Sequence, residues 1–475
     1  MAEQTFCIDF GSGFTKVGLR RHPTATTVLV NDHGIDTTDF CYHSVVVIDR
    51  SGPKPVVEYG KKAAGRAPAN GIEIHANWKQ WLFLTPSGDE PGANSVEAFL
   101  RTDELAKLAA RHGVTATQIG HLRQLVSSAR ELLAGAGVQP VTRDAQRQQF
   151  AASLAVYYFT WLRQEVLKEC ERLPHAGVKY ADIPTRVSVP AFAHGSNVTT
   201  HPGCKFLTTA LVKAGWSLHP ENPVVSEPVA NTVGVLTNGL NATKKNKVDL
   251  GSMFNKGPVI TVGANAKYYA PYRAIVVDVG GYTTDFAVLT LRQDGLLDAD
   301  PERAFDAQQH SVPLGVSDLD KRVLSVLPPE KAAWLSKRSA DELDGFRVTL
   351  YTEGKPVRSG VIGTVGAPGT EGDAVRDQLS QFAAAVGAEV RQFLTAIGTG
   401  GTNELVLTGG GVSIPAVRDA ILTAAAADGR EFVKIHGPDI QKKHTGKPVH
   451  KLDSRIARGG GAIGGSSLFF EPALA

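Results

Sequence analysis

The sequence predicts an α/β protein built from two similar lobes, because two distant segments repeat one pattern of strand, glycine turn and strand. The first segment runs from Phe6 to Arg20, with Gly11-Ser12-Gly13 at its turn. The second runs from Ala274 to Leu289, with Gly280-Gly281 at its turn. The chain has 475 residues, which is enough for two lobes of ordinary domain size.

The two turns have the composition of phosphate-binding loops. Glycines lack Cβ and let backbone N–H groups close around an anion, and the hydroxyl groups of Thr283 and Thr284 add donors. Asp278 and Asp285 would bring carboxylates next to a phosphate, which repels them unless a cation such as Mg²⁺ lies between. One such turn is equally typical of an ordinary β-hairpin. The pair, with Asp9 and Asp278 standing 269 positions apart (278 minus 9), is far more specific.

Five motifs, in the family's order along the chain, resemble the superfamily of actin, the sugar kinases and the seventy-kilodalton heat-shock chaperones, whose members are two-lobed ATPases. They are a first phosphate loop, a connecting helix, a second phosphate loop, an adenosine loop and a final connecting helix. The corresponding segments are Asp9 to Lys16, Ser226 to Asn231, Asp278 to Asp285, Leu405 to Pro415 and Ala457 to Ser467. The resemblance implies an actin-like ATPase fold of duplicated ribonuclease-H-like domains with a central nucleotide cleft.

Three further matches favour the chaperone branch. Gly60 to Leu82 is similar to the chaperone segment that delivers a phosphate-facing lysine, and Lys79 falls on that position. Val187 to Ala191 and Leu314 to Asp320 resemble chaperone segments in the first and second lobes. Two departures point elsewhere, since Lys16 stands where actin has a phosphate-contacting lysine and Tyr282 replaces a chaperone glycine.

The resemblance implies ATP and Mg²⁺ as ligands and assigns roles to charged residues. Asp9 and Asp278 would hold hydrated Mg²⁺, and Lys16 and Lys79 would neutralise phosphate charge. Glu227 would orient the attacking water, because a carboxylate beside the γ-phosphate can hold it in line.

The remaining implied site residues lie on the phosphate and adenosine loops. Thr283 with Asp285 would support the γ-phosphate. The expected nucleotide-binding positions are Gly11, Ser12, Gly13, Lys16, Gly280, Gly281, Gly409, Gly410, Gly411 and Ser413.

The expected elements follow the two-lobe plan. Residues 1–235 would form the first lobe, with a helical insertion at about 85–146, and residues 456–475 would complete it. Residues 236–455 would form the second, with an insertion at about 238–272 and a shortened subdomain at about 318–378. Val28 to Ile48 is expected to continue the first sheet, with Val45 to Ile48 as its apolar strand. Further helices are expected at Arg147 to Arg172, Lys205 to Ala214 and Asp377 to Ile397, before a strand from Glu404 to Thr408.

Composition gives no support for several other kinds of protein. A net charge of +3, from 50 basic and 47 acidic residues, gives no electrostatic argument for nucleic acid or a membrane surface. The four cysteines include no Cys-x-x-Cys pair, so neither zinc nor a disulfide framework is indicated. The start lacks the pattern of a signal peptide and no apolar run approaches eighteen residues, so we expect a cytoplasmic protein.

These observations leave several functions open. The leading hypothesis is a slowly hydrolysing ATPase that acts as a chaperone-like conformational switch on a separate protein partner, because no chaperone-type peptide-binding domain is expected after the last motif. The alternative is a filament-forming bacterial actin-like protein of the cytoskeletal or plasmid-segregation type, which would self-assemble. A small-molecule kinase and a protein that binds ATP without turnover are the weaker possibilities.

Overall fold

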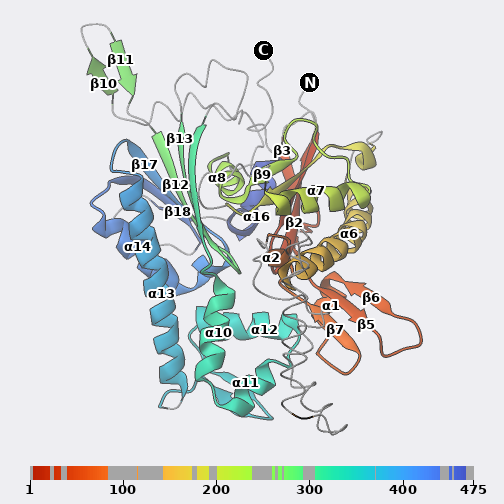
Figure 1. Ribbon diagram of the computed structural model, residues 1–475. Helices are drawn as coiled ribbons and strands as arrows, with labels where there is room; N and C mark the ends of the chain where they lie inside the picture. The colour runs from red at the N-terminus through yellow and green to blue at the C-terminus, as the bar shows by residue number, and fades with distance from the viewer. Residues whose placement is uncertain are drawn as a thin grey trace.

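The chain is a mixed α/β protein in this computed structural model, as the sequence predicts (Figure 1). The structure describes residues 4–21, 26–33, 40–83, 115, 143–173, 179–191, 201–237, 259–262, 266–269, 272–291, 305–369, 371–438, 449–451 and 454–466. Nearly all of the predicted insertion at 85–146, and most of that at 238–272, lies outside these residues. No helix within these ranges has both the length and the hydropathy needed to cross a bilayer.

The first predicted hairpin opens a mixed sheet whose strands run in the order β3-β2-β1-β8-β9, with β4 paired to β2. The bounds are β1 Thr5–Phe10, β2 Phe14–Arg21, β3 Thr26–Leu29, β4 Tyr42–His43, β8 Thr185–Val189 and β9 Val224–Ser226. The first three strands form an antiparallel meander. Strand β8 then pairs in parallel with β1, and β9 pairs in parallel with β8. Strand β1 is buried along its whole length, which is typical of a strand in the middle of a covered sheet.

The second predicted hairpin opens another mixed sheet, in the order β14-β13-β12-β17-β18-β19. The bounds are β12 Tyr272–Val279, β13 Thr284–Leu291, β14 Phe305–Val312, β17 Thr402–Thr408, β18 Phe432–Gly437 and β19 Val449–Lys451. Strands β12, β13 and β14 again form an antiparallel meander. Strand β17 pairs in parallel with β12, and β18 pairs in parallel with β17. If the strands of each sheet are numbered along the chain, with β4 left out, both sheets have the spatial order third, second, first, fourth, fifth, and β19 adds one more strand at the edge of the second sheet.

The prediction that Val28 to Ile48 continues the first sheet is confirmed for β3 and β4, which pair with β2, but it is wrong for the apolar strand at Val45 to Ile48. Strand β5 (Val46–Asp49) lies in a separate sheet between β6 (Val56–Tyr59) and β7 (Ile72–His75). The chain leaves the first sheet after the two residues of β4, and β5 then pairs antiparallel with both later strands. An apolar run predicts a buried strand, but the pairing depends on segments that follow it in the chain.

The remaining elements cover the two main sheets or project from them (Figure 1). The helices are α1 Gly60–Ala64, α2 Lys79–Leu82, α6 Arg143–Cys170, α7 Pro202–Lys213, α8 Glu227–Thr237, α10 Val316–Val326, α11 Pro329–Leu335, α12 Ala340–Arg347, α13 Glu371–Ala396, α14 Pro415–Ala427 and α16 Ser454–Gly465. Short helical segments are η1 Tyr180–Asp182, η6 Val348–Thr352 and η7 Gly410–Ser413, and the small hairpins pair β10 Val259–Val262 with β11 Ala266–Tyr269 and β15 Val357–Ser359 with β16 Gly363–Val365.

Helices α8 and α16 lie between the two sheets (Figure 1). One apolar cluster joins Leu29 of β3, Val276 of β12 and Val406 of β17 to Ile463 of α16. The two helices pack backbone to backbone, since a Cβ on Gly234 would lie 2.2 Å from the carbonyl oxygen of Gly460. Only glycine permits this approach, so the helix pair links the two sheets closely.

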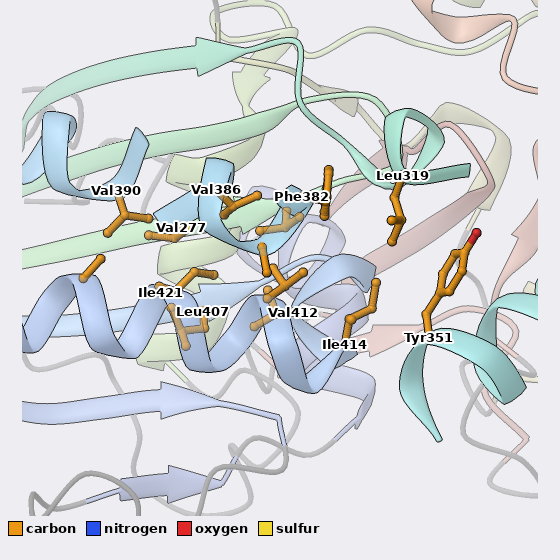
Figure 2. Packing of buried hydrophobic residues seen from close by; sticks show 14 of the residues in the cluster. Val277, Leu319, Tyr351, Phe382, Val386, Val390, Leu407, Val412, Ile414 and Ile421 are labelled. Carbon is orange, nitrogen blue, oxygen red and sulfur yellow. The ribbon is translucent and has the colours of Figure 1, made fainter. Parts of the chain in front are cut away.

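The outer face of the second sheet packs on α13 and α14 (Figure 2). Val277 and Leu407 of the sheet, Val386 and Val390 of α13, and Ile421 of α14 are all buried in this cluster. Burying each such side chain contributes about 1.5–3 kcal/mol. This packing holds β12, and with it the aspartate at its end, in a fixed position.

Helix α13 begins at Glu371, six residues before the predicted start at Asp377. The Glu371 carboxylate accepts hydrogen bonds from Lys331 Nζ at 2.6 Å and from the backbone N–H of Gly366 at 3.2 Å. These contacts, made at the end of the helix where its dipole favours a negative charge, explain the longer helix.

Candidate functional site

The two glycine turns have the same hydrogen-bonded geometry. The N–H of Gly11 donates to the carbonyl of Phe14 at 3.1 Å, and the N–H of Gly280 donates to that of Thr283 at 2.8 Å. These pairs keep the spacing of 269 positions found for the aspartates (280 minus 11 and 283 minus 14). The repeat seen in the sequence is therefore a repeat of backbone structure.

The two turns also lie against each other. A Cβ on Gly281 would lie 3.5 Å from Cβ of Ser12, so the loops from the two sheets meet. Beside them, the Tyr282 hydroxyl hydrogen-bonds Gln80, the residue after Lys79. The departure from glycine at Tyr282 thus gives the second turn a link to α2.

Asp9 is the last residue but one of β1 and is buried among polar partners. Lys16, opposite it in the β1–β2 register, places Nζ 3.1 Å from Asp9 Oδ2, and Ser188 of β8 donates to Oδ1 at 3.2 Å. Burial disfavours the charge on Lys16, but the Asp9 carboxylate, together with Cys41 and Glu227, outweighs this and raises the pKa of Lys16. Lys16 is therefore held as a cation beside the first turn.

Lys79 and Glu227 form a buried ion pair. Lys79 starts α2, Glu227 starts α8, and the Lys79 ammonium contacts Glu227 Oε1 directly. The Lys79 side chain is 6% exposed and that of Glu227 is 14% exposed. Burial raises the pKa of Glu227, although Lys79 opposes that shift. The structure thus brings together two predicted site residues that stand 148 positions apart.

Asp278 is the counterpart of Asp9 at the end of β12. Asn231 Nδ2, from α8, donates to Asp278 Oδ2, and Asp285 lies opposite Asp278 in the β12–β13 register. Burial, followed by the charges of Asp285, Glu227 and Asp9, raises the pKa of Asp278 well above its ordinary value.

Asp285 is almost fully buried beside Thr283, whose hydroxyl donates to its Oδ2 at 2.9 Å. Burial and the charge of Glu227 raise the pKa of Asp285 to about 7. Four carboxyl groups therefore share this region with two lysines, which can compensate at most two negative charges, and burial favours the neutral form of Glu227, Asp278 and Asp285.

The predicted adenosine loop crosses the end of β12. Gly409 has φ of +85°, and a Cβ there would lie 2.3 Å from Asp278 Oδ1, so this position requires glycine. Gly411 packs on Val279, and Gly410 is exposed. Ser413, at the end of η7, is half-buried. All predicted loop positions therefore lie in one segment that starts beside Asp278.

A network of hydroxyl groups behind the first turn was not found from the sequence. Tyr158 OH donates to Thr15 Oγ1 at 2.9 Å, Thr15 contacts Ser44 Oγ at 2.9 Å, and Ser44 Oγ donates to the Gly11 carbonyl at 2.8 Å. The indole N–H of Trp78 donates to the Ser44 carbonyl at 3.0 Å. The network thus connects the first turn to the residue before Lys79, and only the tertiary fold brings its members together.

The carboxylate oxygens of Asp9 and Asp278 are donors of the kind that suit a hydrated Mg²⁺. Among the described residues, no group of three or more His, Cys, Asp or Glu side chains is arranged to hold a metal ion. Mg²⁺ usually keeps several waters and binds through one or two carboxylates plus phosphate oxygens. Asp9 and Asp278 meet that need, and a divalent cation would offset the excess negative charge around them.

No protein-family model matches the chain, and no curated protein is found to be similar to it. The functional conclusion therefore depends on the residues and their geometry.

Proposed function

We propose that this chain is a Mg-ATP-binding, slowly hydrolysing ATPase with a two-lobed, actin-like fold and a central nucleotide cleft, closest to the heat-shock chaperones. We propose further that it acts as a nucleotide-dependent switch on a protein partner. The observation that carries the proposal is the pair of register-matched glycine turns, which end the first strands of two sheets with the same strand order and lie against each other.

Phosphate recognition follows from the groups beside the turns. The turns offer backbone N–H groups, and Lys16 and Lys79 supply positive charge. A γ-phosphate that approaches Lys79 competes with Glu227 for its ammonium group. The freed Glu227 carboxylate can then accept a hydrogen bond from the attacking water and hold that water in line, and such positioning, together with charge stabilisation, is the main protein contribution to phosphoryl transfer.

The remaining predicted residues support the same ligand. Asp9 and Asp278 would hold hydrated Mg²⁺, whose contribution when bound is to neutralise phosphate charge. Thr283 and Asp285 lie at the second turn, where the γ-phosphate would be supported. Gly409 to Gly411 provide backbone without side chains for the adenosine to lie against.

The switch follows from the position of α8 and α16 between the sheets. A ligand held by both turns favours whichever arrangement of the two halves brings the turns to it, so binding would bias a hinge movement. The filament alternative rests on the resemblance at Lys16, which stands at the actin-like position and places its ammonium 3.1 Å from Asp9 beside the first turn.

Phosphate release and right-angle light scattering, recorded together with ATP, with ADP and without nucleotide, test this function. Phosphate release with constant scattering supports the switch. Scattering that rises with ATP and falls as phosphate appears supports the filament. Absence of phosphate release together with absence of nucleotide binding would contradict both.

A further inference from the structure

Asn231 lies between the two central aspartates and its amide has a defined orientation. It is 8% exposed, and its Nδ2 donates to Asp278 Oδ2. The opposite orientation would set the amide oxygen against the ionised carboxylate that a cation requires, where neither atom can donate. The amide is therefore oriented by Asp278.

Helix α16 closes the other side of Asn231. Cβ atoms on Gly460 and Gly461 would lie 3.1 Å and 3.3 Å from Asn231 Oδ1, and the one on Gly461 would also lie 3.0 Å from Cγ of Asp9. The Asn231 side chain thus has little space to turn, because the backbone of α16 is packed against it. A rigid donor of this kind can hold its acceptor in one orientation.

The two sheets hold their aspartates differently. Asp9 lies opposite Ser188 in the strand register and accepts the Ser188 hydroxyl at 3.2 Å. Asp278 lies opposite Thr408 in the corresponding register, but within the described residues the buried Thr408 hydroxyl has no hydrogen-bond partner. The neighbouring-strand hydroxyl that holds Asp9 is thus replaced at Asp278 by an amide from α8.

Helix α8 carries this amide one turn after Glu227. Residues four apart lie on the same face of a helix, so Glu227 reaches Lys79 and Asn231 reaches Asp278 from that one face. The same helix therefore touches the proposed phosphate-binding lysine and one of the two proposed cation-facing aspartates.

We propose that Asn231 is the positioning residue that aims the Asp278 carboxylate at the hydrated cation of a bound Mg-nucleotide, a task that Ser188 performs for Asp9. This inference rests on the proposed function. It requires that removing the Asn231 amide weakens the response to Mg²⁺ more than it weakens binding of the nucleotide itself.

The test measures binding of ADP with a fluorescent ribose substituent, first in EDTA and then across a Mg²⁺ titration. Asn231→Ala removes the donor, and Asn231→Leu removes it while nearly keeping the volume, in case the smaller side chain prevents folding. Thr232→Val is the matched control, because Thr232 is buried on the same helix and its hydroxyl donates to the carbonyl of Pro228. Circular dichroism checks that each variant is folded.

Both Asn231 variants should raise the half-saturating Mg²⁺ concentration about tenfold, with the dissociation constant in EDTA changed less than about twofold, whereas Thr232→Val should change neither. If ADP binding is weakened equally in EDTA and in Mg²⁺, Asn231 is a purely structural residue and the inference is overturned. An unchanged half-saturating Mg²⁺ concentration in either folded variant would also overturn it. If the wild-type protein itself binds no nucleotide at any Mg²⁺ concentration, the proposed function fails, and the inference fails with it through a different result.

Discussion

The buried ion pair between Lys79 and Glu227 gives the most direct prediction about the site. The perturbation is a double-mutant cycle of Lys79→Met and Glu227→Gln, each of which removes one charge and nearly keeps the side-chain volume. Both side chains are largely buried, at 6% and 14% exposed, so either single variant leaves a charged or strongly polar group without its partner.

The expected magnitudes follow from that burial. Removing one partner of a buried ion pair costs about 3–5 kcal/mol of the free energy of unfolding. Because both side chains keep some exposure to solvent, we expect the lower value, about 3 kcal/mol, for each single variant. The double variant leaves no uncompensated charge, and its remaining cost is the unpaired amide that Glu227→Gln introduces, about 1–3 kcal/mol, instead of the roughly 6 kcal/mol that independent sites would give. The coupling energy is therefore about 3–5 kcal/mol.

Equilibrium urea unfolding, followed by tryptophan fluorescence without nucleotide, measures the four free energies of unfolding. Steady-state phosphate release on the same proteins should show Glu227→Gln slowed about a hundredfold, with the dissociation constant for ADP changed less than threefold. Single effects that add to within about 0.5 kcal/mol would refute the ion pair. Unchanged turnover in folded Glu227→Gln would refute the role of this carboxylate in hydrolysis.

Two further predictions concern His219 and Gly409. Burial, with help from a neighbouring arginine, lowers the pKa of His219 to about 4, against about 6.5 in an unfolded chain. The neutral histidine therefore stabilises the fold above pH 6.5, and up to about 3 kcal/mol of the free energy of unfolding is lost as the pH falls toward 4. His219→Gln should flatten this part of the curve of stability against pH. An unchanged slope in this variant would contradict the assignment of the effect to His219. Gly409→Ala adds a Cβ 2.3 Å from Asp278 Oδ1 at φ of +85° and should cost more than about 3 kcal/mol in urea unfolding. Gly429→Ala, at φ of +71° with no atom within 4 Å, should cost only about 1 kcal/mol, and equal costs would rule out the clash.

Local sequence patterns predict the two hairpins because a short turn sets the register of the strands beside it. Asp9 pairs with Lys16, and Asp278 pairs with Asp285, as the repeated pattern implies. The glycines at the turns also indicate where side chains are excluded, and Gly409 is the clearest case.

Contacts between distant segments were predictable only through the resemblance or not at all. Spacing gives no sign that Lys79 meets Glu227, since α2 and α8 approach only in the folded chain. Asn231 belongs to a motif seen in the sequence, and its spacing of four from Glu227 was a signal, but its acceptor lies on another sheet. The sheet to which β5 belongs could not be predicted from its own residues, because its pairing partners β6 and β7 follow it in the chain.

Calorimetric titration of ADP into the wild-type protein, with Mg²⁺ and with EDTA, tests the central claim most directly. We predict one site per chain, with clearly tighter binding in Mg²⁺, and loss of that Mg²⁺ dependence in Asp278→Asn. Absence of binding up to millimolar ADP, or binding that is equally tight in EDTA and unaffected by Asp278→Asn, would contradict a Mg-nucleotide site between the two glycine turns.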